Sequence, residues 1–205
     1  MYVRLLKPII DLSMALLLAV ALLPVFAVLT IVTAIVNSGK VWFVQSRVGY
    51  QEKEFKLYKF KTLLDANTES GQVIEDPVSH RPMVVTRWGR FMRIYSLDEI
   101  PQLINVLLND LSFVGPRPLL PEYINYYSDE EKKRHQVKPG ITGLAQVNGR
   151  KAVEWSQKLA FDVTYVNNIS FLLDMKILVM TLWQCLQPRK ETAEISLIDY
   201  KKQTE

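Results

Sequence analysis

The chain has 205 residues, of which 49% are hydrophobic and 22% are charged, a composition that supports one packed domain with an appendage and excludes global disorder. A single cysteine, Cys185, excludes an intrachain disulfide, and only two histidines accompany it, so we expect no structural zinc site and a reducing compartment. The net charge of +4 comes from scattered basic residues, which favours an anionic substrate or a membrane surface over nucleic acid.

The N-terminal part of the chain is dominated by an apolar run. Leu12 to Val36 holds 25 residues without a charge. As a straight helix this run would measure about 37 Å, which exceeds a hydrocarbon core of about 30 Å. It is too long for a cleavable signal peptide, and no small-residue cleavage pattern follows it. We therefore expect the segment to stay in the chain and to enter a membrane.

Two features of this segment conflict with a simple span. Pro24 falls near its middle, where it frees a helical carbonyl and bends the helix. Positive charges flank the run on both sides, with Arg4 and Lys7 before it and Lys40 and Arg47 after it, which retains both ends on the cytoplasmic face. A re-entrant helix bent at Pro24 satisfies both features. The residues alone leave the re-entrant and the spanning forms open.

A β-hairpin is predicted after the apolar run. Val41 to Val44 has the composition of a buried strand, Gln45 to Tyr50 that of a turn, and Glu54 to Lys61 alternates as a second strand. Lys59 follows two apolar residues on the inward face of the second strand. It either snorkels at the end of the sheet or points its cation into a site, and the strand pattern leaves both readings open.

The middle of the chain alternates polar connections with short helices. Leu64 to Pro82 is polar and rich in turn residues, which predicts an exposed loop. Arg87 to Tyr95 is expected to form a short helix, and Ser96 to cap a second helix that runs to about Leu108. Ser112 to Pro118 is predicted to be an extended loop, stiffened by glycine and proline, that holds Arg117 in a fixed place.

The last third of the chain is predicted to be largely helical. Its expected elements are a surface helix over Pro121 to His135, a tight turn over Lys138 to Gly143, and helices over Ala152 to Val166 and Ser170 to Leu186. The sequence therefore predicts an α+β, mostly helical fold. We expect residues 1–38 to form the membrane helix, residues 39–190 one compact cytosolic domain, and residues 191–205 a loose C-terminal tail.

The Asp98-Glu99 pair is the most informative local feature. Ser96 followed by Glu99 has the spacing of a capping box, and acidic residues are common in a first helical turn, so the pair has a purely structural reading. Four arginines near the pair support a site for anionic groups instead: Arg87, Arg90, Arg93 and Arg117. Without Ser-His or Cys-His partners the pair does not fit acyl transfer. It fits phosphoryl transfer, in which carboxylates bind a divalent metal or attack phosphorus directly.

The chain resembles the bacterial sugar transferases, the monotopic phosphoglycosyl transferases, and is similar to their small Campylobacter-type bacillosamine-phosphate transferases. The resemblance covers about Tyr2 to Leu186 and rests on the order and spacing of several motifs. These are the apolar segment with Pro24, Tyr58-Lys59-Phe60-Lys61, Ser96-Leu97-Asp98-Glu99, Phe113-Val114-Gly115-Pro116-Arg117-Pro118, Arg134-His135, Lys138 to Gly143, Ala145 to Arg150, and Asp162 to Asp174.

The resemblance implies a reaction and a location. It implies transfer of a sugar 1-phosphate from a UDP-sugar to undecaprenyl phosphate with release of UMP, in a two-step route that depends on Mg²⁺. UDP-N,N′-diacetylbacillosamine or a related N-acetylated sugar is the expected donor. It further implies a monotopic protein of the bacterial inner membrane with its catalytic domain on the cytoplasmic face, a re-entrant helix kinked at Pro24, and downstream glycosyltransferases as partners in glycoconjugate synthesis.

The resemblance also implies roles for individual residues. Asp98 matches the nucleophile, and Glu99 its partner at the metal, so both are the implied metal ligands. The positions used around phosphate and metal are Lys59, Arg93, Arg117 and Asp174. Two departures are visible: Leu23 stands where some relatives have a small polar residue, and Lys61 where many have arginine.

Two other functions are compatible with these residues. A membrane-anchored scaffold for glycosyltransferases would have no chemistry of its own, and would tolerate changes at Asp98 and Arg117. A UDP-sugar hydrolase would use the same metal site with water as the acceptor, and would need no lipid to release UMP.

Overall fold

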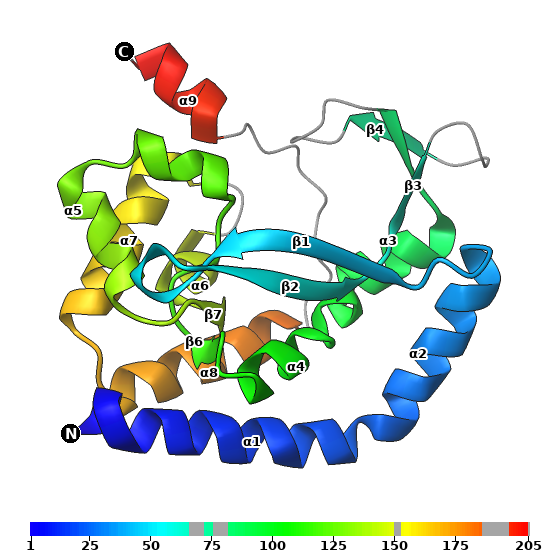
Figure 1. Ribbon diagram of the computed structural model, residues 1–205, viewed down its shortest axis with the longest axis horizontal. Coiled ribbons are helices and arrows are strands. Elements are labelled where there is room, and N and C mark those ends of the chain that lie inside the picture. Colours follow the sequence, from blue (N-terminus) through cyan, green and yellow to red (C-terminus); the bar gives the residue numbers. More distant parts are fainter. Residues whose placement is uncertain (66–71, 76–81, 150–152, 186–196, 205) are drawn as a thin grey trace.

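The structure is a computed structural model that describes residues 1–65, 72–75, 82–149, 153–185 and 197–204 (Figure 1). The α-helices are α1 (Lys7–Ala21), α2 (Leu23–Val36), α3 (Arg87–Ile94), α4 (Gln102–Leu107), α5 (Asp129–Lys132), α6 (Leu144–Gly149), α7 (Trp155–Asn167), α8 (Phe171–Cys185) and α9 (Leu197–Thr204). The strands are β1 (Trp42–Val48), β2 (Glu54–Phe60), β3 (Leu63–Asp65), β4 (Gln72–Glu75), β5 (Pro82–Val85), β6 (Ser112–Val114) and β7 (Gly140–Thr142). The mostly helical α+β class predicted from the sequence is confirmed.

The apolar N-terminal segment is a bent helix. The arm Tyr2–Ala21 meets the arm Leu23–Val36 at an angle of 64°, and Pro24 lies in the first turn of α2. Proline is tolerated there because the first helical N–H groups have no intrahelical acceptor, so the chain bends just before it. In the described part of the chain no single helix is long and apolar enough to cross a membrane, whereas this bent pair passes the same test of length and composition.

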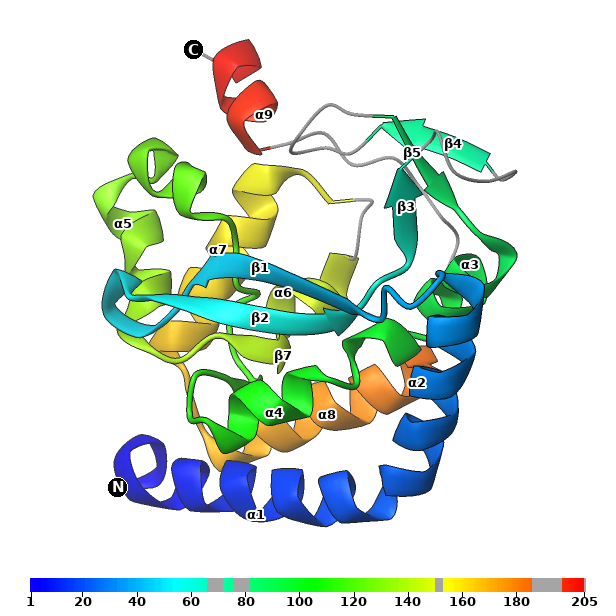
Figure 2. The ribbon, with the colours of Figure 1, turned by 45° about the vertical axis from the view of Figure 1, so that its right-hand side comes forward.

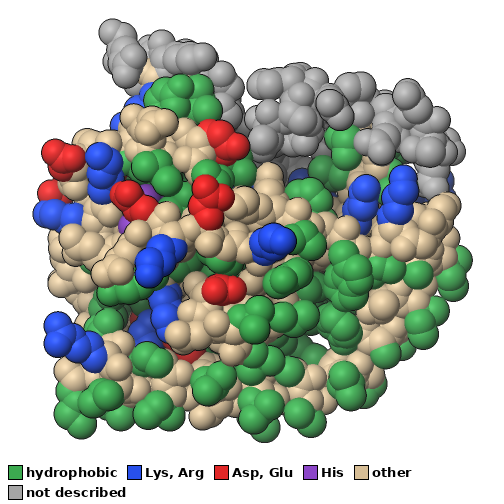
Figure 3. Space-filling model, viewed as in Figure 1, with side chains coloured by type: hydrophobic (Ala, Val, Ile, Leu, Met, Phe, Trp, Pro, Cys, Tyr) green, Lys and Arg blue, Asp and Glu red, His purple; other side chains and the backbone are tan. Residues whose placement is uncertain are grey.

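Both arms of the bent helix are bound to the rest of the fold. Trp88 Nε1 donates to Thr33 Oγ1 at 3.0 Å, and Asn37 Nδ2 donates to the carbonyl of Lys61 at 2.7 Å, which attaches α2. The arm α1 passes beneath α4 and α8, with Ala15 fully buried (Figure 2). The other side of the two arms exposes a row of apolar side chains: Leu12, Leu16, Leu17, Val20, Leu23, Val28, Ile31 and Ile35 (Figure 3).

The strands β1 and β2 form the predicted antiparallel hairpin, with Val44 opposite Tyr58. Two expectations about it were wrong. The first strand is exposed rather than buried: Trp42, Phe43 and Val44 are 46%, 42% and 46% exposed, and their side chains alternate between the two faces of a sheet of only two strands. The first strand also continues to Val48, and the chain reverses in the 3₁₀ turn Tyr50–Glu52.

The segment predicted as an exposed loop, Leu64 to Pro82, contributes to a second sheet instead. Its strands are three or four residues long and pair in the antiparallel order β3-β5-β4. Strands this short, set among polar residues, carry no periodic signal that could be read from the sequence. The remainder of the predicted loop, residues 66–71 and 76–81, lies outside the described residues.

The main core lies between α1, α4, α8 and the parallel pair of strands β6 and β7. Its fully buried members include Ala15, Leu111, Val114, Tyr165 and Ile177. The strand β7 replaces the predicted tight turn over Lys138 to Gly143. The predicted helices over Arg87 to Tyr95, Ala152 to Val166 and Ser170 to Leu186 are confirmed by α3, α7 and α8 within the described residues.

Two predictions for the C-terminal third were wrong. The surface helix expected over Pro121 to His135 is broken into the 3₁₀ turn Pro121–Tyr126, the short α5 and the 3₁₀ turn Lys133–Gln136. The tail expected to be loose ends in α9, whose Leu197 is fully buried against the 3₁₀ turn Pro121–Tyr126, and whose Lys201 Nζ lies 3.1 Å from Glu131 Oε1. Residues 186–196 lie outside the described residues.

Candidate active site

Glu99 is the point at which three distant segments meet. Its Oε1 accepts a 2.7 Å hydrogen bond from Lys59 Nζ on β2 and a 3.4 Å hydrogen bond from Arg117 Nη2 on the loop after β6. The side chains of Lys59 and Glu99 are 17% and 13% exposed, whereas that of Arg117 is 48% exposed. The arrangement is a mostly buried ion pair with a half-exposed arginine beside it. Lys59 therefore points its cation at Glu99 and not along the end of the sheet into solvent.

Asp98 lies next to Glu99 in the 3₁₀ turn Leu97–Glu99 and is partly buried. The turn begins at Ser96, whose φ of 57° is left-handed, a conformation that a residue with a side chain adopts at a cost of about 1–2 kcal/mol. Such strain is often stored at functional sites. The turn presents two consecutive carboxylates outside a regular helix.

The capping box predicted at Ser96 and Glu99 was wrong. Ser96 makes no side-chain cap bond in the described structure, and its buried Oγ has no hydrogen-bond partner there. The regular helix α4 starts only at Gln102 and has six residues. The expectation that Asp98 lies in the first turn of a helix was therefore wrong. A capping box does form elsewhere, between Ser128 and Glu131 at the start of α5.

Asn105 fixes the distance between β2 and the turn that carries the two carboxylates. It is fully buried on α4, accepts from the Tyr58 backbone N–H at 3.1 Å and donates to the Lys56 carbonyl at 2.7 Å. Because Lys59 directly follows Tyr58, these bonds hold the lysine against the segment that bears Glu99. Sequence reasoning missed Asn105, since an amide in an apolar helical stripe gives no signal of its distant partners.

The loop that carries Arg117 is held at its backbone. Gly115 N–H donates to the Thr142 carbonyl and Gly140 N–H to the Pro116 carbonyl, both at 2.9 Å. A Cβ atom on Gly140 would lie 2.1 Å from the Gly115 nitrogen, so only glycine allows this approach. The prediction that Gly115 and the flanking prolines would fix Arg117 therefore has a structural basis in the pairing of β6 with β7.

Arg47 is a further cation of this region. The sequence marked it only as a charge that follows the apolar run, and gave no sign of its place beside Arg117. It lies on β1, and its Nη1 approaches the Pro118 carbonyl at 3.5 Å. Burial, together with the positive charge of Arg117, lowers the pKa of Arg47 to about 10. The guanidinium therefore stays protonated at neutral pH and adds to the positive potential near Glu99.

Arg93 lies on the last turn of α3 and is partly buried. Its carbonyl accepts the Ser96 backbone N–H at 3.3 Å, so the residue is continuous with the turn that holds Asp98. The structure thus brings Lys59 and Arg117 to Glu99, and it places Arg93 at the end of the helix that leads into the turn with the acidic pair.

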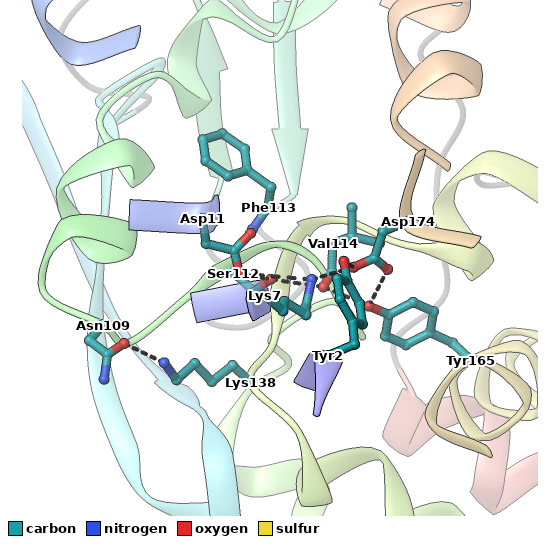
Figure 4. A network of polar contacts seen from close by, with 10 residues as sticks. All are labelled: Tyr2, Lys7, Asp11, Asn109, Ser112, Phe113, Val114, Lys138, Tyr165 and Asp174. Atoms are coloured by element: carbon teal, nitrogen blue, oxygen red, sulfur yellow. Dashed lines mark hydrogen bonds and ion pairs between the residues drawn. The ribbon is translucent and has the colours of Figure 1, made fainter. Parts of the chain in front are cut away.

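Asp174, which was also expected around phosphate and metal, contacts the N-terminal helix and Tyr165. It is 2% exposed on α8, and its Oδ2 accepts from Lys7 Nζ at 2.7 Å and from the Tyr2 hydroxyl at 2.6 Å (Figure 4). Its Oδ1 accepts from the Tyr165 hydroxyl at 2.7 Å, and burial, together with Asp174, raises the pKa of that phenol. The Asp174 carboxylate therefore fastens the N-terminal helix to α8.

Asp11 completes this buried polar network. Ser112 Oγ donates to its Oδ2 at 2.7 Å, the Phe113 backbone N–H donates to its Oδ1 at 3.3 Å, and Lys7 Nζ lies 3.8 Å away (Figure 4). Because β6 leads directly into the loop with Arg117, the network ties the bent helix to the site. Local sequence patterns cannot show such contacts, since the partners are about 100 residues apart.

Asp98 and Glu99 offer carboxylate oxygens, the donors that Mg²⁺ prefers. Within the described residues no group of three or more His, Cys, Asp or Glu side chains is close enough to bind a metal. Magnesium in phosphoryl-transfer sites requires less, because it keeps several waters and binds one or two carboxylates together with substrate phosphates. The oxygen donors of Asp98 and Glu99 fit this mode, and they do not fit a metal site built from protein ligands alone.

The sequence matches the bacterial sugar transferase family over residues 2–188. The chain therefore belongs to the bacterial sugar transferase family, as its motifs indicated. All of the residues gathered at the candidate site lie inside this match, whereas α9 lies beyond it.

Individual relatives share this region. The "Uncharacterized sugar transferase EpsL" of Bacillus subtilis is 49% identical over 146 residues, which are 71% of this chain and 70% of EpsL. The UDP-glucose:undecaprenyl-phosphate glucose-1-phosphate transferase of Escherichia coli is 34% identical over 88% of this chain and 40% of its own length. The undecaprenyl-phosphate galactose phosphotransferase of Salmonella typhimurium is 35% identical over 71% of this chain and 33% of its own length.

Proposed function

We propose that the protein is a phosphoglycosyl transferase that moves a sugar 1-phosphate from a UDP-sugar to undecaprenyl phosphate and releases UMP. The observation that carries the proposal is the meeting of Lys59 and Arg117 on Glu99, directly beside Asp98. The names of the Escherichia coli and Salmonella relatives describe sugar phosphotransferases that act on undecaprenyl phosphate. The site has the charge distribution that this reaction requires, because cations offset the charge of a diphosphate while carboxylates remain available.

In the first step a carboxylate oxygen of Asp98 attacks the phosphorus that bears the sugar. The bond from that phosphorus to the oxygen bridging the two phosphates breaks, and its electron pair leaves with UMP. The product on the protein is an acyl phosphate between Asp98 and the sugar 1-phosphate. The attack needs no general base, because a carboxylate oxygen attacks without a proton to lose. Lys59, Arg93 and Arg117 reduce the repulsion between the carboxylate and the diphosphate.

In the second step an oxygen of undecaprenyl phosphate attacks the same phosphorus. The acyl phosphate bond breaks, the electron pair returns to Asp98 as a carboxylate, and the sugar leaves on a lipid diphosphate. The two steps balance without an added oxidant, reductant or external base. Glu99, held by Lys59 and Arg117, keeps its position beside Asp98 through both steps.

Asp98 and Glu99 are the residues that would hold Mg²⁺ together with the diphosphate. Bound there, the ion would offset the negative charge of the diphosphate and of the departing UMP. Release of UMP should therefore stop when EDTA is added and resume when Mg²⁺ is restored in excess.

The apolar outer face of α1 and α2 supports a re-entrant placement in the cytoplasmic leaflet of the bacterial inner membrane. Both ends of the bent helix are attached to the same domain, through the Asp174 network at one end and through Thr33 and Asn37 at the other. In a Cys185→Ser background, cysteines introduced at Val3 and Lys40 should both resist a membrane-impermeant thiol reagent applied to intact cells. Labelling of only one of them would instead show a spanning helix.

For the donor sugar we propose UDP-N,N′-diacetylbacillosamine or a related N-acetylated UDP-sugar. The relatives are named for different hexoses, so the family accepts more than one sugar. A panel that includes UDP-glucose and UDP-galactose, assayed for UMP release, tests the proposal. A higher kcat/KM for either hexose than for the acetylated sugars contradicts it.

The reaction itself is tested by UMP release from the purified protein, with and without undecaprenyl phosphate. Multiple turnovers should require the lipid, and Asp98→Asn should abolish them, while the surface control Asp129→Asn, whose side chain is fully exposed, keeps the wild-type rate. Sustained UMP release without lipid would show a hydrolase. Absence of UMP release for every donor, in a folded protein, would favour a scaffold for glycosyltransferases.

A further inference from the structure

Arg134 and Asp162 form a buried ion pair directly behind the loop of Arg117. Arg134 Nε and Nη2 donate to Asp162 Oδ2 at 3.1 Å and 2.7 Å, and the two side chains are 2% and 5% exposed. Arg134 lies in the 3₁₀ turn Lys133–Gln136, and Asp162 on α7. The pair therefore joins two elements that lie outside the candidate active site.

The same guanidinium reaches the backbone of Arg117. Arg134 Nη2 donates to the Arg117 carbonyl at 2.7 Å, and Nη1 donates to the Tyr127 hydroxyl at 3.3 Å. Its cationic carbon lies 5.5 Å from the centre of the Tyr127 ring. One buried side chain thus binds a carboxylate, a phenol and the carbonyl of a residue whose own side chain contacts Glu99.

Stability does not account for such a pair. Removing two charges from water costs several kcal/mol per ion, and well-packed apolar side chains of similar volume often serve stability as well or better. A buried ion pair does impose one geometry, because each hydrogen-bond donor must meet its acceptor. Here the geometry that it imposes is that of the Arg117 carbonyl.

We propose that the buried Arg134–Asp162 pair is a positioning device that fixes the backbone of Arg117, and thereby sets where the Arg117 guanidinium meets Glu99 and the substrate phosphates. The identity of the substrate rests on the proposed function. The positioning of Arg117 rests on the contacts of Arg134 described above. It concerns residues behind the site, and it treats neither of them as a group that touches the reacting atoms.

The side chain of Arg117 needs a fixed base. It is 48% exposed and long, so its position depends on the backbone from which it starts. The next carbonyls are also held, since the Val48 N–H donates to the Leu119 carbonyl at 3.0 Å, and Arg47 approaches the Pro118 carbonyl. The bond from Arg134 lies at the residue that bears the functional side chain, so its loss should displace the guanidinium most directly.

The first test separates positioning from folding. The double variant Arg134→Met/Asp162→Leu removes both charges and replaces them by apolar side chains of similar shape, so we expect its melting temperature to stay within a few degrees of the wild type. Its kcat/KM for UMP release should fall on the order of 100-fold, the effect of a displacement of about 1 Å at a phosphoryl-transfer site. Wild-type kcat/KM in this variant would overturn the proposal.

A mutant cycle then asks whether the effect passes through Arg117. In an Arg117→Ala background the same double replacement should lower kcat/KM by less than about 3-fold, because the guanidinium that the pair positions is already gone. If Arg117→Ala and the double replacement lower kcat/KM by independent factors that multiply, the proposal is overturned. Arg134→Lys serves if the apolar pair fails to fold, because one ammonium group cannot make the bonds to Asp162 and to the Arg117 carbonyl in the arginine geometry.

A second readout does not depend on turnover. A nitroxide attached to Arg117→Cys in the Cys185→Ser background should be immobilised when Arg134 and Asp162 are present, and should show a mobile component in Arg134→Met/Asp162→Leu. Identical spectra would overturn the positioning role whatever the activity. Changed spectra, together with an unlabelled wild-type protein that releases no UMP from any donor, would instead uphold positioning and reject the proposed function.

Discussion

Lys59 Nζ and Glu99 Oε1 lie 2.7 Å apart, although 40 residues separate them in the chain. Asn105 on α4 accepts from the Tyr58 backbone N–H and donates to the Lys56 carbonyl. These two bonds hold β2 close to the 3₁₀ turn that bears Glu99. An ion pair that is mostly buried and flanked by an exposed arginine leaves its charges close to any diphosphate that enters. The ion pair therefore suits the binding of a diphosphate better than it suits stabilisation of the fold.

Replacing Lys59 by methionine should lower kcat for UMP release by roughly 100- to 1,000-fold, the usual effect of removing one group that stabilises developing charge. The melting temperature should also fall, because the mostly buried Glu99 loses its closer cation, so the rates are compared at a temperature at which the variant is folded. Lys56→Met, on the exposed face of the same strand, is the matched control and should keep the wild-type rate. Equal rates in the two variants would remove Lys59 from the site.

Ser96→Gly should leave the melting temperature unchanged or raise it. Glycine adopts the left-handed conformation without the cost that serine carries, and the change removes a buried hydroxyl that lacks a partner in the described structure. A capping serine would behave in the opposite way, since replacing it by glycine costs about a few tenths of a kcal/mol. Thermal unfolding in detergent distinguishes the two, and Ser128→Gly, at the capping box of α5, provides the comparison.

Asp174→Ala should destabilise the protein by roughly 3–5 kcal/mol, because it leaves the buried Lys7 ammonium without its closest carboxylate. The double variant Lys7→Met/Asp174→Leu should recover most of that loss, since it removes both charges. UMP release by the recovered variant, measured at a temperature at which it is folded, should lie within about 10-fold of the wild type. Loss of activity with full recovery of stability would return Asp174 to the catalytic group.

His135 should make stability depend on pH. Burial, together with the neighbouring Arg134 charge, lowers the pKa of His135 to about 4, while Glu52 opposes the shift. The unfolded chain therefore binds a proton near pH 6.5 that the folded protein does not accept until about pH 4. The stability due to the neutral ring is complete above pH 6.5 and is lost as the pH falls toward 4, by on the order of 2 kcal/mol.

The check on this prediction is a difference between two proteins, because carboxylates titrate in the same range. The fall in melting temperature between pH 7 and pH 5 should be larger for the wild type than for His135→Gln, whose side chain does not titrate. Parallel falls in the two proteins would show that the ring is protonated equally in the folded and unfolded states.

The predictable parts of the fold are those set by local patterns. Alternation along Glu54 to Lys61 gave the second hairpin strand, and the long helices α7 and α8 followed from apolar periodicity. The bend at Pro24 followed from its missing N–H. The acidic pair and its cations were found because charges cluster in sequence around Asp98, and because the motifs resemble a known family.

Other features depend on contacts that no local pattern records. Ser96 and Glu99 have the spacing of a capping box in a helix and in a left-handed turn alike, so the sequence could not distinguish them. The sequence around Asp174 is the same whether the carboxylate serves a metal and phosphate site or accepts from Lys7. Only the fold brings it against the N-terminal helix. The Arg134 bond to the Arg117 carbonyl is invisible for the same reason, since any residue offers a carbonyl.

Intact-protein mass spectrometry can detect the proposed covalent bond between Asp98 and the sugar 1-phosphate. Wild-type protein mixed with its UDP-sugar and Mg²⁺, without lipid, should gain the mass of one sugar phosphate on the peptide that contains Asp98. The added mass should disappear when undecaprenyl phosphate is supplied, and should never form in Asp98→Asn. Lipid-dependent turnover without any such adduct, or an adduct that persists in Asp98→Asn, would contradict the account.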